Sequence, residues 1–116
     1  MAVDDDPDHL KLVDQVLKEA GFITCTAANG VEALQKIHQF QPDLIVVDAA
    51  MPEMNGFTFC EVVRKNLATA TIPIVMLTGL TSSFYRYNGM AHGASNFLLK
   101  PFKTDELVAM VKELLR

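Results

Sequence analysis

The stretch LIVVDAAMPEMNG, residues 44–56, combines an apolar run, a single acid and a loop. Leu44 to Val47 form the continuous apolar run that is typical of a strand buried on both faces. Asp48 ends this run, and two alanines, a proline and the pair Asn55-Gly56 come after it. A single carboxylate after a strand is most often a turn or helix cap. The role of Asp48 therefore depends on which residues end the other apolar runs of the chain.

Apolar runs alternate with helical patterns along the rest of the chain. Further strands are expected at residues 1–3, 22–27, 72–77 and 96–99. Apolar residues recur at helical spacing over residues 10–20, 33–37, 59–63 and 107–114. A weaker helix is expected over Ser82 to His92, which holds several poor helix formers. Strands that alternate with helices predict an α/β fold, a doubly wound five-stranded parallel sheet with helices on both faces.

Three helix boundaries are marked by residue type. Asp6 before Pro7 predicts an N-cap followed by proline at the first helical position. Gly21 stands where this helix is expected to stop. Asn29 with Glu32 has the spacing of a capping box and predicts the start of the second helix.

Length and composition restrict the class of protein. A chain of 116 residues predicts one domain, residues 1–116, with no output domain after the last helix. The net charge of −4 argues against a nucleic-acid-binding surface. No apolar run is long enough to span a membrane, and no signal peptide opens the chain. Cys25 and Cys60 match no metal spacing, so we expect ordinary core thiols in a reducing cytosol.

Polar side chains follow four of the five expected strands. Asp4 and Asp5 follow the first, Asp48 the third, Thr78 the fourth and Lys100 the fifth. Each fragment alone fits turn or cap chemistry, or a solvated acidic run. In a parallel sheet, however, all of these positions lie at the carboxyl edge, where ligands bind in open α/β folds. The topology therefore predicts one shared site.

The residue types of such a site indicate its chemistry. Three crowded carboxylates repel one another, which favours a bound cation or a raised pKa. Hard oxygen ligands suit Mg²⁺. Lys100 can pair with a phosphoryl oxygen, and Thr78 can donate a hydrogen bond to the same group. A carboxylate between a metal and an ammonium has the surroundings of a nucleophile that forms an aspartyl phosphate.

Four segments, taken in order, resemble the receiver domains of two-component response regulators. They are VDDDP at 3–7, DAAMPEMNG at 48–56, PIVMLTG at 73–79 and GASNFLLKPF at 93–102. The resemblance implies the flavodoxin-like strand order 2-1-3-4-5 and transfer of a phosphoryl group from a kinase histidine to the aspartate. It implies a signalling switch that catalyses only its own phosphorylation and dephosphorylation.

The resemblance also assigns roles at the acidic end of the site. Asp48 corresponds to the phosphoacceptor. Mg²⁺ is expected on Asp5 and Asp48 directly, on Asp4 mainly through water, and on the backbone carbonyl of Ala50.

The resemblance assigns two further roles. Lys100 pairs with the phosphoryl group, and its bond to Pro101 is expected to be cis. Thr78 bonds a phosphoryl oxygen after modification and acts with Phe97 as the switch.

The implied partners are a sensor histidine kinase or phosphotransfer protein and a downstream protein or output domain. The output surface is expected on the fourth helix, the fifth strand and the last helix. The resemblance implies a cytoplasmic protein, a monomer or phosphorylation-dependent dimer, whose receiver domain contacts neither nucleic acid nor membrane.

The sequence departs from the family's usual pattern at three places. The first strand has only three residues ahead of the acids, which is short for a central strand. Phe97 replaces a frequent tyrosine, and Leu80 is apolar near the expected position of the attacking water. His9, His38 and His92 lie at no expected strand end, so we expect no proton-relay role for them.

Two alternatives are open. A phosphatase of the haloacid-dehalogenase type would also use a strand-end aspartate and Mg²⁺, but it needs a second aspartate where this chain has Ala50. A pseudo-receiver would be an interaction module that is never phosphorylated, and the intact acids, Thr78 and Lys100 argue against it.

Overall fold

The computed structural model describes residues 1–79 and 93–116, and its strands form one parallel sheet in the order β2-β1-β3-β4-β5. The strands are β1 (Ala2–Val3), β2 (Thr26–Ala27), β3 (Ile45–Asp48), β4 (Ile74–Thr78) and β5 (Asn96–Leu99). The described helices are α1 (Pro7–Glu19), α2 (Gly30–Phe40), α3 (Gly56–Lys65) and α5 (Thr104–Leu114). The predicted doubly wound fold and strand order are confirmed. The weak helix expected at residues 82–92 and the departure at position 80 lie outside the described residues.

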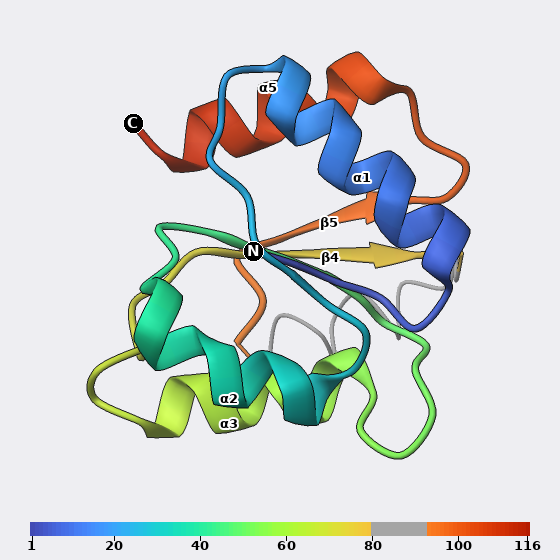
Figure 1. Ribbon diagram of the computed structural model, residues 1–116. Coiled ribbons are helices and arrows are strands. Elements are labelled where there is room, and N and C mark those ends of the chain that lie inside the picture. Colours follow the sequence, from blue (N-terminus) through green and yellow to red (C-terminus); the bar gives the residue numbers. More distant parts are fainter. Residues whose placement is uncertain (80–92) are drawn as a thin grey trace.

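Helices cover both faces of the sheet. Figure 1 shows α1 and α5 on one side and α2 and α3 on the other. Successive side chains of β3 enter opposite cores because strand side chains alternate. Val47 packs in the cluster that includes Phe59 of α3, whereas Val46 packs in the cluster that includes Leu107 of α5. The continuous apolar run is therefore buried on both faces, as predicted. No described helix is long and apolar enough to cross a membrane.

The predicted caps fix where the first two helices begin. Asp6 accepts from two backbone N–H groups of the first turn of α1, at 3.0 and 3.4 Å. Asn29 accepts from the backbone N–H of Glu32 at 2.8 Å. The Glu32 carboxylate accepts from Ala28 N–H at 3.1 Å, one residue before the position that a standard capping box uses. Gly21 has a φ of 97°, the left-handed conformation that favours glycine after a helix.

Two strands begin at least two residues later than predicted. The second was expected over residues 22–27 but comprises only Thr26–Ala27. It lies at the edge of the sheet, and its partner β1 has just two residues. Cys25 O still accepts from Ala2 N–H, but residues 22–24 have no opposite residue to pair with. The fourth was expected from Ile72 but begins at Ile74. Pro73 comes between them and has no N–H to donate to a ladder.

Candidate functional site

The carboxyl edge of the sheet brings together the polar residues that the sequence placed after its strands. Asp4 follows β1, and Asp48 and Thr78 are the last residues of β3 and β4. Lys100 follows β5, and its bond to Pro101 is cis, as expected. In the sheet register, Asp48 lies opposite Leu77, the residue before Thr78.

Three carboxylates form a cluster at this edge. Asp4, Asp5 and Asp48 each offer an oxygen, and these oxygens lie within 4.8 Å of one another. Asp4 and Asp48 are buried, whereas Asp5 is exposed. Carboxylates this close repel unless a cation joins them. Oxygen donors with an open, solvent-facing side suit Mg²⁺, which keeps several of its own waters.

Asp48 has a positive and a negative neighbour, the ammonium group of Lys100 and the carboxylate of Asp4. The Lys100 ammonium donates to Asp48 Oδ1. Burial is the largest influence on the Asp48 carboxyl and raises its pKa, and the nearby charge of Asp4 raises it further. The Lys100 ammonium and the backbone N–H of Ala50 act in the opposite direction without reversing the shift. The site therefore holds a desolvated carboxylate whose charged form depends on nearby positive charge.

Asp4 already has a bond at each of its oxygens. Oδ1 accepts from the backbone N–H of Asp6 at 3.0 Å, and Oδ2 contacts the Nδ1 atom of His9. Asp5 instead presents its carboxylate to solvent. The two neighbouring acids therefore differ in how readily they can become direct ligands of a metal.

His9 is the site residue that sequence reasoning missed. It lies in the first turn and a half of α1, five residues after Asp4, and its ring also meets Phe102 edge-on at 5.9 Å. The available signal was the N-cap at Asp6. Because α1 starts directly after the acids, its first turn lies over the end of β1. His38 is exposed and belongs to no described part of the site, and position 92 lies outside the described residues.

The two residues expected to form the switch are both buried. Thr78 is 3% exposed, and its carbonyl accepts from the Lys100 backbone N–H at 2.7 Å. Phe97 lies opposite Met76 in the sheet register and packs in the core cluster between the sheet and α2 and α3. The Phe97 ring is thus inside the protein.

The loop between β3 and α3 is fastened close to Asp48. Asn55 caps α3 through the Thr58 N–H at 3.0 Å, and Gly56 N–H donates to Ala49 O at 3.0 Å. A Cβ added to Gly56 would lie 2.7 Å from the Asp48 carbonyl oxygen. Only glycine fits this close approach, so the loop holds Ala50 beside the carboxylate.

Comparisons with known proteins agree with this arrangement. The family model described as "Response regulator receiver domain" matches residues 1–112. DNA-binding response regulator MtrA of Mycolicibacterium smegmatis is 40% identical over all of this chain and 50% of its own length. DNA-binding dual master transcriptional regulator RpaA of a Synechocystis strain is 39% identical over all of this chain and 48% of its own. The chain thus spans about half the length of these relatives.

Solved structures show the same fold. Chemotaxis protein CheY4 of Vibrio cholerae superposes with a TM-score of 0.93 and 38% identity, over 98% of this chain and 95% of that one. The receiver domain of Francisella response regulator 1452 superposes with a TM-score of 0.90 and 32% identity, over 98% and 93%.

Proposed function

The chain belongs to the family of response-regulator receiver domains of two-component signalling, and from this membership we propose that it is a switch phosphorylated on Asp48. The phosphoryl group comes from the histidine of a sensor kinase or phosphotransfer protein. One observation carries the proposal. A buried carboxylate at a strand end contacts the Lys100 ammonium and shares its edge with Asp4 and Asp5.

The transfer step assigns a role to each polar side chain. An Asp48 oxygen attacks the phosphorus, and the bond between phosphorus and the histidine nitrogen breaks. The electron pair of that bond stays on the imidazole. Lys100 and the Thr78 hydroxyl bind the phosphoryl oxygens, where negative charge accumulates during transfer. The chain catalyses this step and the later hydrolysis only on itself.

The metal in this proposal is Mg²⁺. Asp5 and Asp48 bind it directly, the Ala50 carbonyl adds a backbone ligand, and Asp4 acts mainly through water. The bonds that Asp4 already makes to Asp6 N–H and His9 support its indirect role. Bound Mg²⁺ supplies positive charge that offsets the carboxylates and the incoming phosphoryl oxygens.

The output of the switch is a change on one surface of the domain. We place this surface on β5 and α5, together with the expected fourth helix, which lies outside the described residues. Its partner is a downstream protein or an attached output domain. The names of the curated relatives include DNA binding. We assign any such contact to a region outside this domain, since its net charge is −4. The domain works in the cytoplasm as a single unit, residues 1–116, either as a monomer or as a phosphorylation-dependent dimer.

The test is phosphorylation by a small donor. The protein is incubated with acetyl phosphate and Mg²⁺, and the adduct is mapped by mass spectrometry. We expect one phosphoryl group on Asp48, none on Asp48→Asn, and normal labelling of the control Asp105→Asn, which changes an exposed acid of α5. Undiminished labelling of Asp48→Asn would contradict the proposal. Turnover of p-nitrophenyl phosphate would favour the phosphatase alternative instead.

The metal assignment has its own titration. We expect Asp5→Ala to abolish measurable Mg²⁺ binding, whereas Asp105→Ala binds as the parent does. Mg²⁺ binding by Asp5→Ala with the parent's affinity would show that the direct ligands lie elsewhere.

A further inference from the structure

The loop between β3 and α3 makes a tight turn beside the acidic site. Met54 N–H donates to Pro52 O at 2.7 Å, two residues earlier, so the backbone turns sharply within three residues. Glu53, at the centre of this turn, has a φ of 67°. A residue with a side chain rarely adopts this left-handed conformation, which costs free energy. Contacts elsewhere in the loop must therefore keep the turn in place.

Two methionines flank the turn and attach it to the protein. Met51 is buried in the core cluster between the sheet and α2 and α3, and Met54 is partly buried against the same cluster. Glu53 lies between them and is exposed. Apolar side chains on both sides thus hold the turn, while its central residue faces solvent.

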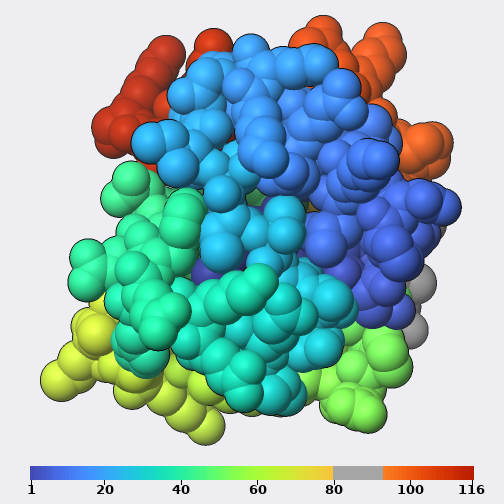
Figure 2. Space-filling view, in the orientation of Figure 1, coloured from blue at the N-terminus to red at the C-terminus, as the bar shows by residue number. Residues whose placement is uncertain are grey.

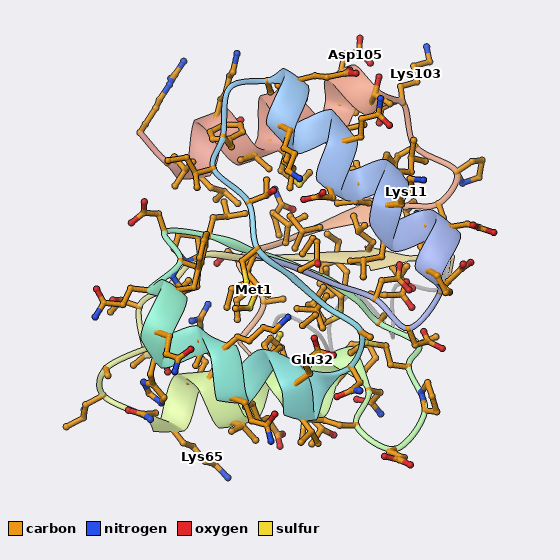
Figure 3. The ribbon with its side chains drawn as sticks, viewed as in Figure 1. Met1, Lys11, Glu32, Lys65, Lys103 and Asp105 are labelled. Carbon is orange, nitrogen blue, oxygen red and sulfur yellow. The ribbon has the colours of Figure 1, made fainter. Side chains whose placement is uncertain are left out.

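Met54 packs against the first residue of α2, Gly30, which is buried. A Cβ added to Gly30 would lie 2.7 Å from Met54 Sδ, 3.1 Å from its Cγ and 3.3 Å from its Cβ. Glycine therefore leaves the space that Met54 fills, and an unbranched, flexible methionine suits such an irregular gap. Figure 2 shows the green loop, at lower right, against the first residues of α2. Figure 3 labels Glu32 in the first turn of α2, at the end of the helix beside this loop.

The start of α2 is a firm support for this contact. Asn29 accepts from the backbone N–H of Glu32, and the Glu32 carboxylate accepts from Ala28 N–H. Gly30 lies between these capping residues. The backbone against which Met54 packs is therefore held by hydrogen bonds on both sides.

The same loop carries the backbone next to Asp48. The backbone N–H of Ala50 donates to the Asp48 carboxylate, and Gly56 N–H donates to Ala49 O at 3.0 Å. Met54 comes four residues after Ala50 and two before Gly56. A shift of Met54 would therefore be passed through a short, closed loop to the Ala50 carbonyl.

We propose that Met54 is a positioning residue of the site. Its side chain, packed against Gly30, keeps the turn at Glu53 in place and thereby fixes the Ala50 carbonyl beside Asp48. The inference rests on the proposed function, in which this carbonyl is a ligand of Mg²⁺. The start of α2 thus supports the metal site, although none of the proposed ligands belongs to α2.

The experiment compares five variants of the full chain. Met54→Ala removes the packed side chain, and Met54→Leu replaces it with one of similar volume. Gly30→Ala fills the space that Met54 occupies, and Gly30→Ala/Met54→Ala changes both partners. Met110→Ala is the matched control, because Met110 is also partly buried but packs in the cluster on the other face of the sheet.

The first measurement is Mg²⁺ affinity by isothermal titration. Met54→Ala should weaken binding about ten-fold, the low end of the effect usual for residues that hold a metal ligand in place. Gly30→Ala should weaken it as well, whereas Met54→Leu and Met110→Ala should bind as the parent does. The double variant should match Met54→Ala, because both single changes remove the same contact.

The second measurement is hydrogen exchange of the Gly56 amide in the metal-free protein, which reports the closed loop without any metal. Met54→Ala should speed this exchange, Met54→Leu should leave it unchanged, and Met110→Ala shows how much a general loss of stability contributes. Parent-like Mg²⁺ affinity in Met54→Ala would overturn the proposal, as would parent-like exchange of its Gly56 amide. If the parent itself binds no Mg²⁺, the metal assignment of the proposed function fails, and Gly56 exchange alone decides whether Met54 fixes the loop.

Discussion

The imidazole of His9 in α1 contacts the carboxylate of Asp4 at the end of β1. The same carboxylate accepts from Asp6 N–H, the backbone of the residue that caps α1. The start of α1 and one acid of the candidate metal site are thus joined by two contacts. Residues that hold a metal ligand in place usually affect metal affinity although they do not touch the metal.

We predict that His9→Leu weakens Mg²⁺ binding by about three- to ten-fold, because Asp4 loses the group that orients it. His9→Asn keeps a side-chain N–H near the position of Nδ1 and should stay close to the parent. Isothermal titration of all three proteins at one pH measures the difference. Parent-like affinity in His9→Leu would show that the Asp6 N–H alone orients this carboxylate.

Gly56→Ala should change stability in the opposite direction from most glycine-to-alanine substitutions in helices. Alanine in place of a helical glycine normally stabilises a protein. At Gly56, however, the added Cβ would lie 2.7 Å from Asp48 O and 2.9 Å from the Ala49 Cα, and both are backbone atoms that cannot easily move. We predict that Gly56→Ala lowers the free energy of unfolding by about 1–3 kcal/mol and slows phosphorylation by acetyl phosphate.

The matched control for this substitution is Gly79→Ala. A Cβ at Gly79 would meet no atom of the described residues within 4 Å. Its stability should therefore equal or slightly exceed that of the parent, because alanine reduces the freedom of the unfolded chain. Equal stability of Gly56→Ala and Gly79→Ala in urea would show that the loop beside Asp48 can make room for the added Cβ without a loss of stability.

The buried thiol of Cys60 should make the stability of the protein depend on pH in the alkaline range. Burial raises the pKa of its thiol to about 12 from an ordinary 9.0, and the nearby Arg64 charge opposes the shift only in part. Between these two values the unfolded chain loses a proton that the folded chain keeps, so stability falls as pH rises above 9. The loss should reach roughly 1 kcal/mol at pH 10.

Urea unfolding of Cys60→Ala and Cys25→Ala at pH 8 and pH 10 isolates this effect. Cys60→Ala should lose less stability than the parent between the two pH values. Cys25→Ala, which removes the half-buried cysteine, is the control for the loss of a thiol. An identical loss in Cys60→Ala and the parent would show that the thiol ionises without unfolding.

The sequence predicted the sheet because strand and helix patterns alternate and each strand's polar residue marks the same edge. Asp48 shows this most clearly. It is the last residue of an apolar strand buried on both faces, and in a parallel sheet the last residue of each strand lies at the carboxyl edge. Local pattern could not predict that residues 22–24 lie outside the ladder, because pairing depends on how far β1 extends. It also missed His9, whose contact with Asp4 depends on how α1 lies over the sheet.

The last prediction concerns how the proposed phosphorylation of Asp48 would reach the proposed output surface. A hydrogen bond from Thr78 to a charged phosphoryl oxygen would be worth about 1.5–3 kcal/mol, enough to shift a two-state balance roughly ten- to a hundred-fold. Movement of Thr78 would leave space for an inward ring at position 97. Phe97 is buried, and its ring has no hydroxyl that would need a partner inside the protein. We therefore expect the ring to stay inward before phosphorylation as well, so that the resting state holds part of the active arrangement.

A tyrosine at this position would behave differently. Its hydroxyl would need a partner if the ring stayed inside, so the resting state of Phe97→Tyr should favour an outward ring. We predict that beryllofluoride, which mimics the phosphoryl group, shifts the amide resonances of β5 and α5 more in Phe97→Tyr than in the parent. Thr78→Ala should lose most of the shift, and the control Thr71→Ala, at an exposed position, should keep it. If Thr78→Ala responds to beryllofluoride as strongly as the parent, the response does not depend on the hydroxyl at the end of β4. The signal would then pass from Asp48 by another route.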